Sequence, residues 1–163
     1  MKTTSERIGD LLRSANQTLS TAESCTGGMI AHKITAVSGC SDYYKGSVVS
    51  YCNDVKMNQL GVSQSDLESH GAVSRPVVEQ MAGGVRNLLA TDYALATSGI
   101  AGPGGGTAEK PVGTVWMALA TPDGVESRCC HFGTDRAENI EKASESALEM
   151  LLDFLLEREK SVR

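Results

Sequence analysis

The segment TLSTAESCTGGMIAHKI, residues 18–34, decides the fold class of this chain. Its first part, residues 18–22, is predicted to form a strand, and a helix is expected to begin at Thr26–Gly28 and to end near Ser38–Gly39. A strand that passes directly into a helix is the first half of the strand–helix–strand unit from which parallel sheets are built. The segment therefore predicts an α/β protein.

The rest of the chain extends this alternation of helices and strands. Residue patterns predict further helices over residues 5–17, 53–61, 65–71, 74–89 and 134–159, and strands over residues 47–52, 92–98, 112–120 and 125–132. The sequence Thr-Pro-Asp-Gly at residues 121–124 is typical of a hairpin turn. Early alternation and a late hairpin predict a mixed sheet with helices on both faces, which is a three-layer sandwich.

Length and composition are those of one globular domain. The chain has 163 residues, of which 40% are hydrophobic and 21% are charged. A chain of this kind can bury a core without disulfides or metal ions. No repeat, low-complexity tract or linker divides it. We therefore expect residues 1–163 to form a single domain.

Membranes and nucleic acids are not expected as partners. The longest apolar stretches, Ala94–Ala96 and Val115–Ala120, are far shorter than the ~20 residues that cross a bilayer. Residues 1–10 lack the apolar region of a signal peptide. The net charge is −5 and no cluster of Lys and Arg exceeds a pair, which argues against binding to a phosphate backbone.

The five cysteines indicate a reducing compartment. Their number is odd and no secretory signal is present, so we expect free thiols in the cytoplasm. Cys129-Cys130-His131 lacks the paired spacing of a zinc site. We expect no metal, and we expect the thiols to pack as small hydrophobic groups.

Three segments could carry chemistry, and the first is Thr21–Gly28. It places the hydroxyl of Ser24 where a strand passes into a helix, and its glycines allow close approach of a ligand. Free N–H groups at the helix start would bind a phosphate or stabilise an oxyanion. The alternative is that Ser24 and Thr26 only cap the helix.

The second and third segments also follow predicted strands. In Tyr51–Lys56 the lysine can turn back toward the sheet edge, although such a lysine is more often a solvated surface charge. Ser98–Gly106 is rich in glycine and follows a buried strand. A loop of this composition is costly to order, which favours a ligand-binding role over a plain turn.

The histidines do not suit a Ser-His-Asp system. His32 falls inside a predicted helix, His70 at a helix end and His131 in a hairpin strand. A hydrolase built on this chain would need another base. A lysine can serve if burial lowers its pKa well below ~10.4.

Six motifs occur together along the chain. They are Glu23–Gly28, Tyr51–Lys56, Leu60–Val62, His70–Ser74, Ser98–Pro103 and Lys110–Trp116. In this order they resemble the CinA C-terminal domain, the nicotinamide-nucleotide amidohydrolase family, from about Ser5 to Leu156. Cys52 departs from the Ser or Thr usual in the family, and Asp54 from its frequent Glu.

The resemblance implies an enzyme that needs no cofactor. It implies hydrolysis of the carboxamide of nicotinamide mononucleotide to nicotinate mononucleotide and ammonia, in the salvage of NAD. It implies Ser24 as a nucleophile assisted by Lys56 and Tyr51. The residues expected to bind this substrate are Thr26, Gly27, Gly28, Ser98, Gly99, Gly102, Gly104 and Arg136. A homo-oligomer of a stand-alone CinA C-terminal-like domain, without an N-terminal fusion domain, is also expected.

The proposed mechanism has a geometric consequence and two rivals. Ser24 is expected at a helix N-terminus, with the Lys56 ammonium in reach of its hydroxyl directly or through Tyr51. One rival makes Cys25 the nucleophile, because thiolates are intrinsically stronger. The other is a regulatory module that binds a nucleotide without chemistry. Release of ammonia separates an enzyme from such a module.

Overall fold

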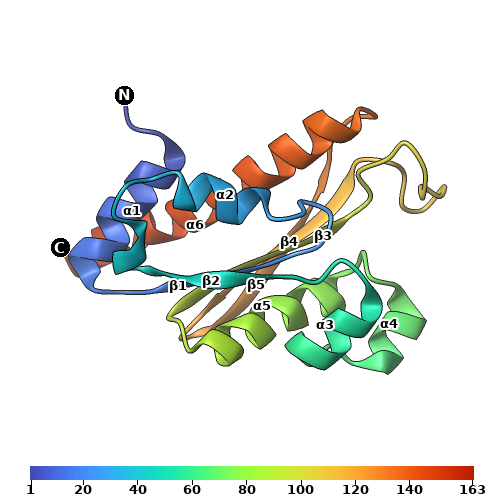
Figure 1. Cartoon of the computed structure of the whole chain (residues 1–163), viewed down its shortest axis with the longest axis horizontal. Coiled ribbons are helices and arrows are strands. Elements are labelled where there is room, and N and C mark those ends of the chain that lie inside the picture. The colour runs from blue at the N-terminus through green and yellow to red at the C-terminus, as the bar shows by residue number, and fades with distance from the viewer.

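A mixed sheet of five strands forms the middle layer of the computed structural model, which describes residues 1–163 (Figure 1). The strands are β1 (Leu19–Glu23), β2 (Tyr44–Val49), β3 (Tyr93–Gly99), β4 (Thr114–Thr121) and β5 (Gly124–His131), in the spatial order β2-β1-β3-β4-β5. Strand β1 pairs in parallel with β2 and β3, whereas the β3–β4 and β4–β5 pairs are antiparallel. The prediction of a mixed sheet is confirmed.

Helices cover both faces of the sheet. On one face lie α1 (Thr4–Ala15), α2 (Met29–Thr35) and α6 (Arg136–Val162), and on the other lie α3 (Asn53–Leu60), α4 (Gln64–His70) and α5 (Arg75–Leu89). A short 3-10 helix, η1 (Cys40–Asp42), joins α2 to β2. Each face has its own buried apolar cluster. The predicted three-layer α/β sandwich is thus confirmed, and none of its helices has the length and apolar character needed to cross a membrane.

Local sequence signals explain where several helices begin. The Thr3 hydroxyl accepts a hydrogen bond from the N–H of Glu6, whose carboxylate accepts one from the N–H of Thr3. This reciprocal capping box starts α1. Asp135 caps α6 by accepting from the N–H of Glu138, and Pro76 lies in the first turn of α5.

The second strand begins and ends earlier than predicted. Strand β2 covers Tyr44–Val49 rather than residues 47–52, because its pairing with β1 begins at Tyr44. Lys45 and Gly46 have low strand propensity, so the sequence pattern does not indicate that a strand starts here. Tyr51 therefore lies in the connection after the strand and not within it.

The helix after β1 begins later than predicted. Gly27 and Gly28 have φ angles of 59° and 101°, a left-handed backbone that glycine adopts without strain. Helix α2 therefore starts at Met29. Ser24 lies at the end of β1, ahead of this turn, so the prediction that it occupies a helix N-terminus is wrong.

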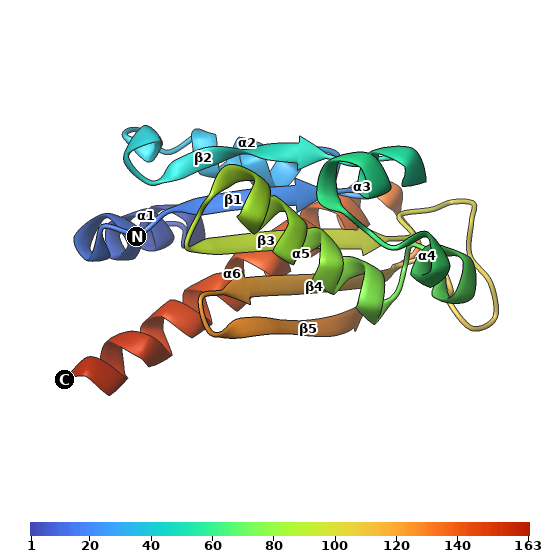
Figure 2. The same ribbon diagram turned by 90° about the horizontal axis from the view of Figure 1, so that it is seen from below.

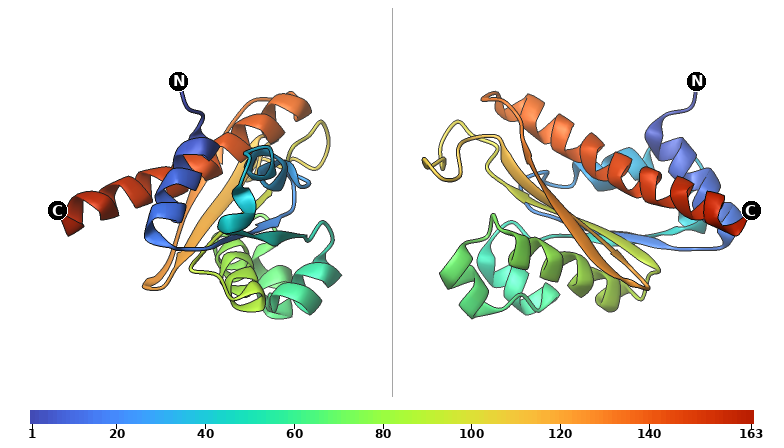
Figure 3. Two further views of the ribbon diagram at one scale, coloured as in Figure 1. Left: turned by 60° about the vertical axis from the view of Figure 1, so that its left-hand side comes forward. Right: turned by 180° about the vertical axis from the view of Figure 1, so that it is seen from behind.

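The carboxyl ends of β1, β2 and β3 point to the same side of the molecule, where α3 and the long β3–β4 connection also lie (Figure 2). Helix α6 crosses one face of the sheet diagonally, and its C-terminal turns project beyond the sheet (Figure 3). Ligands of α/β proteins bind at the carboxyl ends of parallel strands. This side of the molecule is therefore where the three candidate segments can meet.

Candidate active site

The three candidate segments meet at one open cavity of about 310 Å³ beside the ends of β1 and β3. Of the predicted site residues, those that line this cavity are Ser24, Tyr51, Lys56, Ser98, Gly99, Gly102, Gly104 and Arg136. They come from four parts of the chain that are far apart in sequence. The topology of the sheet, and not sequence proximity, brings them together.

Lys56 is buried beside Ser24. Its Nζ lies 3.0 Å from Ser24 Oγ, 2.7 Å from the backbone oxygen of Ser50 and 3.3 Å from that of Tyr51. Only 1% of the residue is exposed. Helix α3 begins directly after the short connection that follows β2, so its first turn directs Lys56 back toward the end of β1. The prediction that Lys56 reaches the Ser24 hydroxyl is confirmed.

Nζ contacts three oxygens, a number that matches both an ammonium with three N–H donors and a neutral amine with two donors and one lone pair. The carbonyls of Ser50 and Tyr51 can only accept, so they take two donors. Protonated Nζ donates to Ser24 Oγ at 3.0 Å, and in the neutral amine the lone pair faces the same hydroxyl, which can then donate its proton. Burial favours this neutral state by lowering the pKa of the Lys56 amine. The arrangement is the one required of a general base.

The burial of Lys56 predicts a stability that depends on pH. Between the lowered pKa of the folded state and the ordinary ~10.4, the unfolded chain binds more protons than the native protein, so stability rises with pH. Within this window we expect the free energy of unfolding of the wild type, relative to Lys56→Met, to rise by up to about 1.4 kcal/mol per pH unit. Denaturant titrations of both proteins across the alkaline range measure this. A difference independent of pH would contradict a titrating amine at this position.

Of the two predicted routes from Lys56 to Ser24, the direct one is present and the relay through the Tyr51 hydroxyl is not. That hydroxyl accepts a hydrogen bond from Arg136 Nη2 at 3.2 Å, and 63% of the residue is exposed. Only the backbone carbonyl of Tyr51 contacts Lys56. Tyr51 lies beyond the end of β2, so its side chain reaches the start of α6 instead.

The start of α6 also holds the glycine-rich loop in place. Arg136 Nη1 donates to the backbone oxygen of Gly102 at 2.7 Å. The buried side-chain amide of Asn139 donates to the backbone oxygens of Ala101 and Gly133, at 3.0 Å each. Its oxygen accepts from the N–H of Gly133, also at 3.0 Å. These bonds fix the wall of the cavity that the loop forms.

Sequence reasoning missed Asn139. This residue shares the buried stripe of α6 with Ala143 and Ala147, which follow it at intervals of four residues. A single amide on an apolar stripe is a signal that could have identified it, because a buried amide needs hydrogen-bond partners. Asn53, which lines the cavity from the first residue of α3, was also missed and carries no such signal.

Ser98 supports the opposite wall. Its hydroxyl donates to the backbone oxygen of Ala72 at 2.8 Å. Ala72 and Val73 belong to the α4–α5 connection and line the same cavity. Ser98 therefore positions this connection, besides lining the cavity itself.

Thr26, Gly27 and Gly28 do not line the cavity, contrary to prediction. The reason is the fully buried carboxylate of Glu23. It accepts from the Thr26 hydroxyl at 2.7 Å and from two N–H groups in the first turn of α2, at 2.9 and 3.0 Å. The carboxylate of Glu23 thus binds N–H groups at the start of α2, where the prediction placed a phosphate. Neither Ser24 nor Thr26 caps α2, whose N-cap is Gly28.

Free backbone donors lie elsewhere around the cavity. The N–H of Ser24 donates to Thr97, and that of Gly27 to Ser24. In contrast, the N–H of Cys25, a cavity-lining residue, makes no hydrogen bond to another backbone group. The N–H groups of the loop over residues 101–106 also make none. These donors are available to an anionic ligand or an oxyanion.

Comparison with known proteins identifies the family. A sequence model of the CinA C-terminal domain matches residues 1–155. The chain belongs to this family. The CinA-like proteins of Salinibacter ruber and Desulfosudis oleivorans are 50% and 51% identical to it over 142 and 150 residues. These regions cover 87% and 91% of the chain but only 34% and 36% of the relatives, so the chain spans about a third of their length.

Solved CinA structures share the fold along nearly their whole length. The competence/damage inducible protein CihA of Agrobacterium tumefaciens is 41% identical, with a TM-score of 0.90 and 92% of each chain covered. A CinA superfamily protein of Klebsiella pneumoniae is 34% identical, with a TM-score of 0.90 and coverage of 96% of this chain and 99% of its own. The α/β sandwich is therefore that of the CinA domain.

In this CinA domain Cys25 is a poor candidate for the nucleophile. Its thiol is buried, and burial raises its pKa to about 12. The nearby negative charge of Glu23 acts in the same direction. At neutral pH the thiolate needed for attack is therefore scarce. The Ser24 hydroxyl, with a buried amine beside it, is the better nucleophile.

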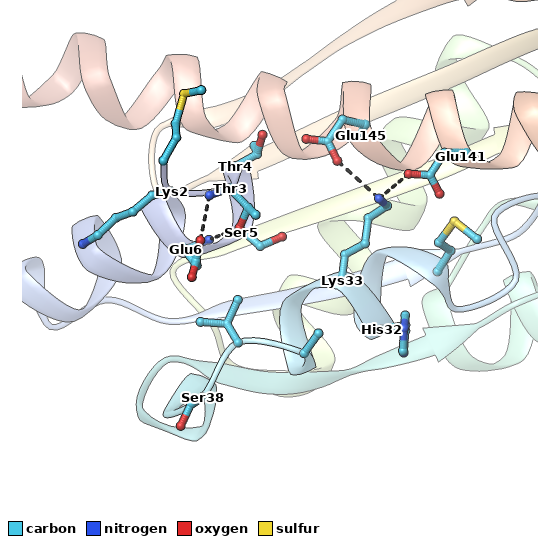
Figure 4. Close-up of a pocket in the computed structure, with 14 residues that line it drawn as sticks. Lys2, Thr3, Thr4, Ser5, Glu6, His32, Lys33, Ser38, Glu141 and Glu145 are labelled. Atoms are coloured by element: carbon cyan, nitrogen blue, oxygen red, sulfur yellow. Dashed lines mark hydrogen bonds and ion pairs between the residues drawn. The ribbon is translucent and has the colours of Figure 1, made fainter.

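A larger hollow of about 1090 Å³ lies between α1, α2 and α6 (Figure 4). Its wall includes Lys33, which forms ion pairs with Glu141 and Glu145 at 2.5 and 3.4 Å. One ammonium is thus shared by two carboxylates, and none of the predicted site residues lines the hollow. The smaller cavity around Ser24 and Lys56 is therefore the candidate active site of the CinA domain.

Proposed function

We propose that this CinA domain hydrolyses the carboxamide of nicotinamide mononucleotide to nicotinate mononucleotide and ammonia. The observation that carries the proposal is the 3.0 Å contact between the Ser24 hydroxyl and the buried Lys56 amine. A nucleophile beside its base is what acyl transfer requires. The choice of substrate follows from the resemblance to the amidohydrolase family. A cavity of about 310 Å³, near the lower end for small-molecule sites, is consistent with a mononucleotide.

In the first half of the reaction Ser24 Oγ attacks the carboxamide carbon while Lys56 takes the hydroxyl proton. The cationic pyridinium ring withdraws electrons from this carbon, which makes it more electrophilic than a peptide carbonyl. The C–N bond of the tetrahedral intermediate then breaks, and the Lys56 ammonium gives its proton to the departing nitrogen. Ammonia leaves, and the nicotinoyl group remains as an ester on Ser24.

Water completes the reaction. Neutral Lys56 takes a proton from a water molecule as the water oxygen attacks the ester carbon. The bond between that carbon and Ser24 Oγ breaks, and the proton returns from Lys56 to Oγ. Nicotinate mononucleotide is released, and both side chains regain their starting states.

We assign the N–H of Cys25 to the oxyanion, because it belongs to the residue that follows the nucleophile and makes no hydrogen bond to another backbone group. Such a donor is typically worth ~3–4 kcal/mol in the transition state. The Tyr51 hydroxyl, held by Arg136, is assigned to positioning the substrate at the cavity mouth. The relay of a proton is not required of it, since Lys56 contacts Ser24 directly.

We place the phosphate of the substrate at the glycine-rich loop and Arg136. The loop offers free N–H groups over residues 104–106, and Arg136 lines the same cavity. Glu23 already occupies the start of α2, which leaves the loop as the richest group of free donors. The net charge of −5 is no obstacle, because screening over ~8 Å lets local groups decide.

A comparison of substrates tests this function. We expect kcat/KM for nicotinamide mononucleotide to exceed that for nicotinamide riboside about 100-fold or more, since the riboside lacks the charge-assisted bonds of the phosphate. The riboside should also have a lower kcat, because phosphate binding orients the carboxamide at Ser24. Ammonia release measures both constants. Equal values for the two compounds would remove the phosphate site from the proposal.

The rival regulatory module makes a different prediction for the same assay. A module that only binds would show binding of the mononucleotide in a calorimeter and would release no ammonia over hours.

We place the enzyme in the cytoplasm, because all five cysteines are unpaired and free thiols persist in a reducing compartment.

A further inference from the structure

Strand β5 forms an open edge of the sheet (Figure 2). It pairs with β4 along its whole length without a register shift, and most of its residues are exposed. An edge of this kind presents a row of unpaired backbone N–H and C=O groups to a further strand. The opposite edge, β2, is shorter, and its pairing with β1 contains a register shift. The β5 edge is therefore the better template for pairing.

We propose that β5 pairs antiparallel with β5 of a second copy, so that two sheets join into one around a two-fold axis at Ser127. This surface would form the homo-oligomer independently of the catalytic proposal. Pairing through an edge supplies backbone hydrogen bonds, and side chains on the paired strands select the partner and the register.

Charge selects the register. With a two-fold axis perpendicular to the sheet, the same face of each copy lies on the same side of the joined sheet. Residues that lie directly opposite each other must then have side chains on the same face, so the axis passes beside one residue of β5 and not between two residues. An axis at Glu126 or at Arg128 would place two like charges directly opposite each other, which is destabilising. With the axis at Ser127, Glu126 of each copy faces Arg128 of the other. This register creates two symmetric ion pairs.

The neighbouring positions agree with this register. Val125 is an exposed apolar residue, with 43% of its surface accessible. With the axis at Ser127 it lies opposite Cys129 of the second copy. Each exposed valine then gains an apolar neighbour across the interface.

The groove between β5 and α6 offers further complementarity. This hollow of about 410 Å³ is lined by Glu126, Asp153 and Glu157, and Arg128 is its sole cation. Arg128 Nη2 donates to the backbone oxygen of Ser146 at 2.8 Å, which leaves its other N–H groups free. None of the ion pairs within the chain includes Glu126 or Asp153. An Arg128 arriving from a second copy opposite Glu126 would meet these unpaired carboxylates.

A charge swap tests the proposal. Glu126→Arg and Arg128→Glu each place like charges at both symmetric positions, so the dissociation constant of the dimer should rise at least about tenfold. The double variant Glu126→Arg/Arg128→Glu restores both pairs in reversed order and should dimerise like the wild type. Sedimentation equilibrium over a range of concentrations measures each constant. Glu68→Arg, a charge reversal on α4, is the matched control and should leave dimerisation unchanged.

A cross-link tests the register itself. Residues at the axis lie with their Cα atoms ~4.5–5.5 Å apart, which is within the range of a disulfide. Ser127→Cys should therefore form a covalent dimer under mild oxidation, at a rate well above that of the wild type with its native cysteines. Asp123→Cys, in the hairpin turn, should not. A monomeric wild type, or single charge variants that dimerise normally, would overturn the proposal.

Discussion

Ser24→Ala is expected to lower kcat for the amide of nicotinamide mononucleotide at least about 10³-fold, because the ester intermediate cannot form without Oγ. The Lys56 amine contacts no other hydroxyl that could replace it. Substrate affinity should change much less, since many other residues line the cavity. Ammonia release and calorimetric binding of the substrate measure the two effects separately.

Two control variants show whether the fall in kcat of Ser24→Ala is specific to the Ser24 hydroxyl. Ser161→Ala makes the same chemical change on an exposed turn of α6 and should leave kcat unchanged. Cys25→Ala keeps the backbone amide of the proposed oxyanion site and should cost far less activity than Ser24→Ala. The reverse pattern, an active Ser24→Ala beside an inactive Cys25→Ala, would make the thiol the nucleophile.

Lys56→Arg is expected to lower kcat by about 10²–10⁴-fold, the usual contribution of a general base. Arginine keeps the positive charge but does not lose its proton in proteins, so the variant isolates the base function. In the wild type kcat/KM should rise with pH, because only the neutral amine can accept the Ser24 proton. The midpoint should lie below the ordinary lysine value of ~10.4, since burial lowers the pKa of Lys56.

The pH profile separates loss of the base from damage to the fold. Lys56→Arg should lack the rising limb, whereas Lys142→Arg, on an exposed face of α6, should keep both the limb and the rate. Thermal unfolding of each variant reports on the fold. Near-normal turnover by Lys56→Arg would show that Lys56 is not the base.

The fold class followed from local patterns in the sequence. Apolar residues at helical spacing, such as Ile8 and Leu12 in α1, are buried on the face that the pattern predicts. Strand β3 reads as a continuous buried run and is buried along almost its whole length. Such patterns are informative because burial of one face is what holds each element in place.

Element ends were less predictable, because they depend on partners from other parts of the chain. Strand β2 starts at Tyr44, where its pairing with β1 begins and where the Tyr44 hydroxyl lies 2.7 Å from that of Thr21. The residues around Lys45–Gly46 show no pattern that predicts a strand. The start of α2 was displaced by the left-handed turn at Gly27 and Gly28, a conformation that glycine permits but does not require.

By itself the sequence determined the α/β class and the three loops of the candidate site, because apolar spacing and short motifs are properties of neighbouring residues. The pairing of Ser24 with Lys56 was expected only from the resemblance to the CinA family. Only the tertiary structure decided that Glu23 fills the start of α2, that the Tyr51 hydroxyl binds Arg136, and that Asn139 holds the glycine-rich loop. Each of these is a contact between segments distant in sequence. Their partners are chosen by the need to satisfy polar groups that burial removes from water, and burial exists only once the chain has folded.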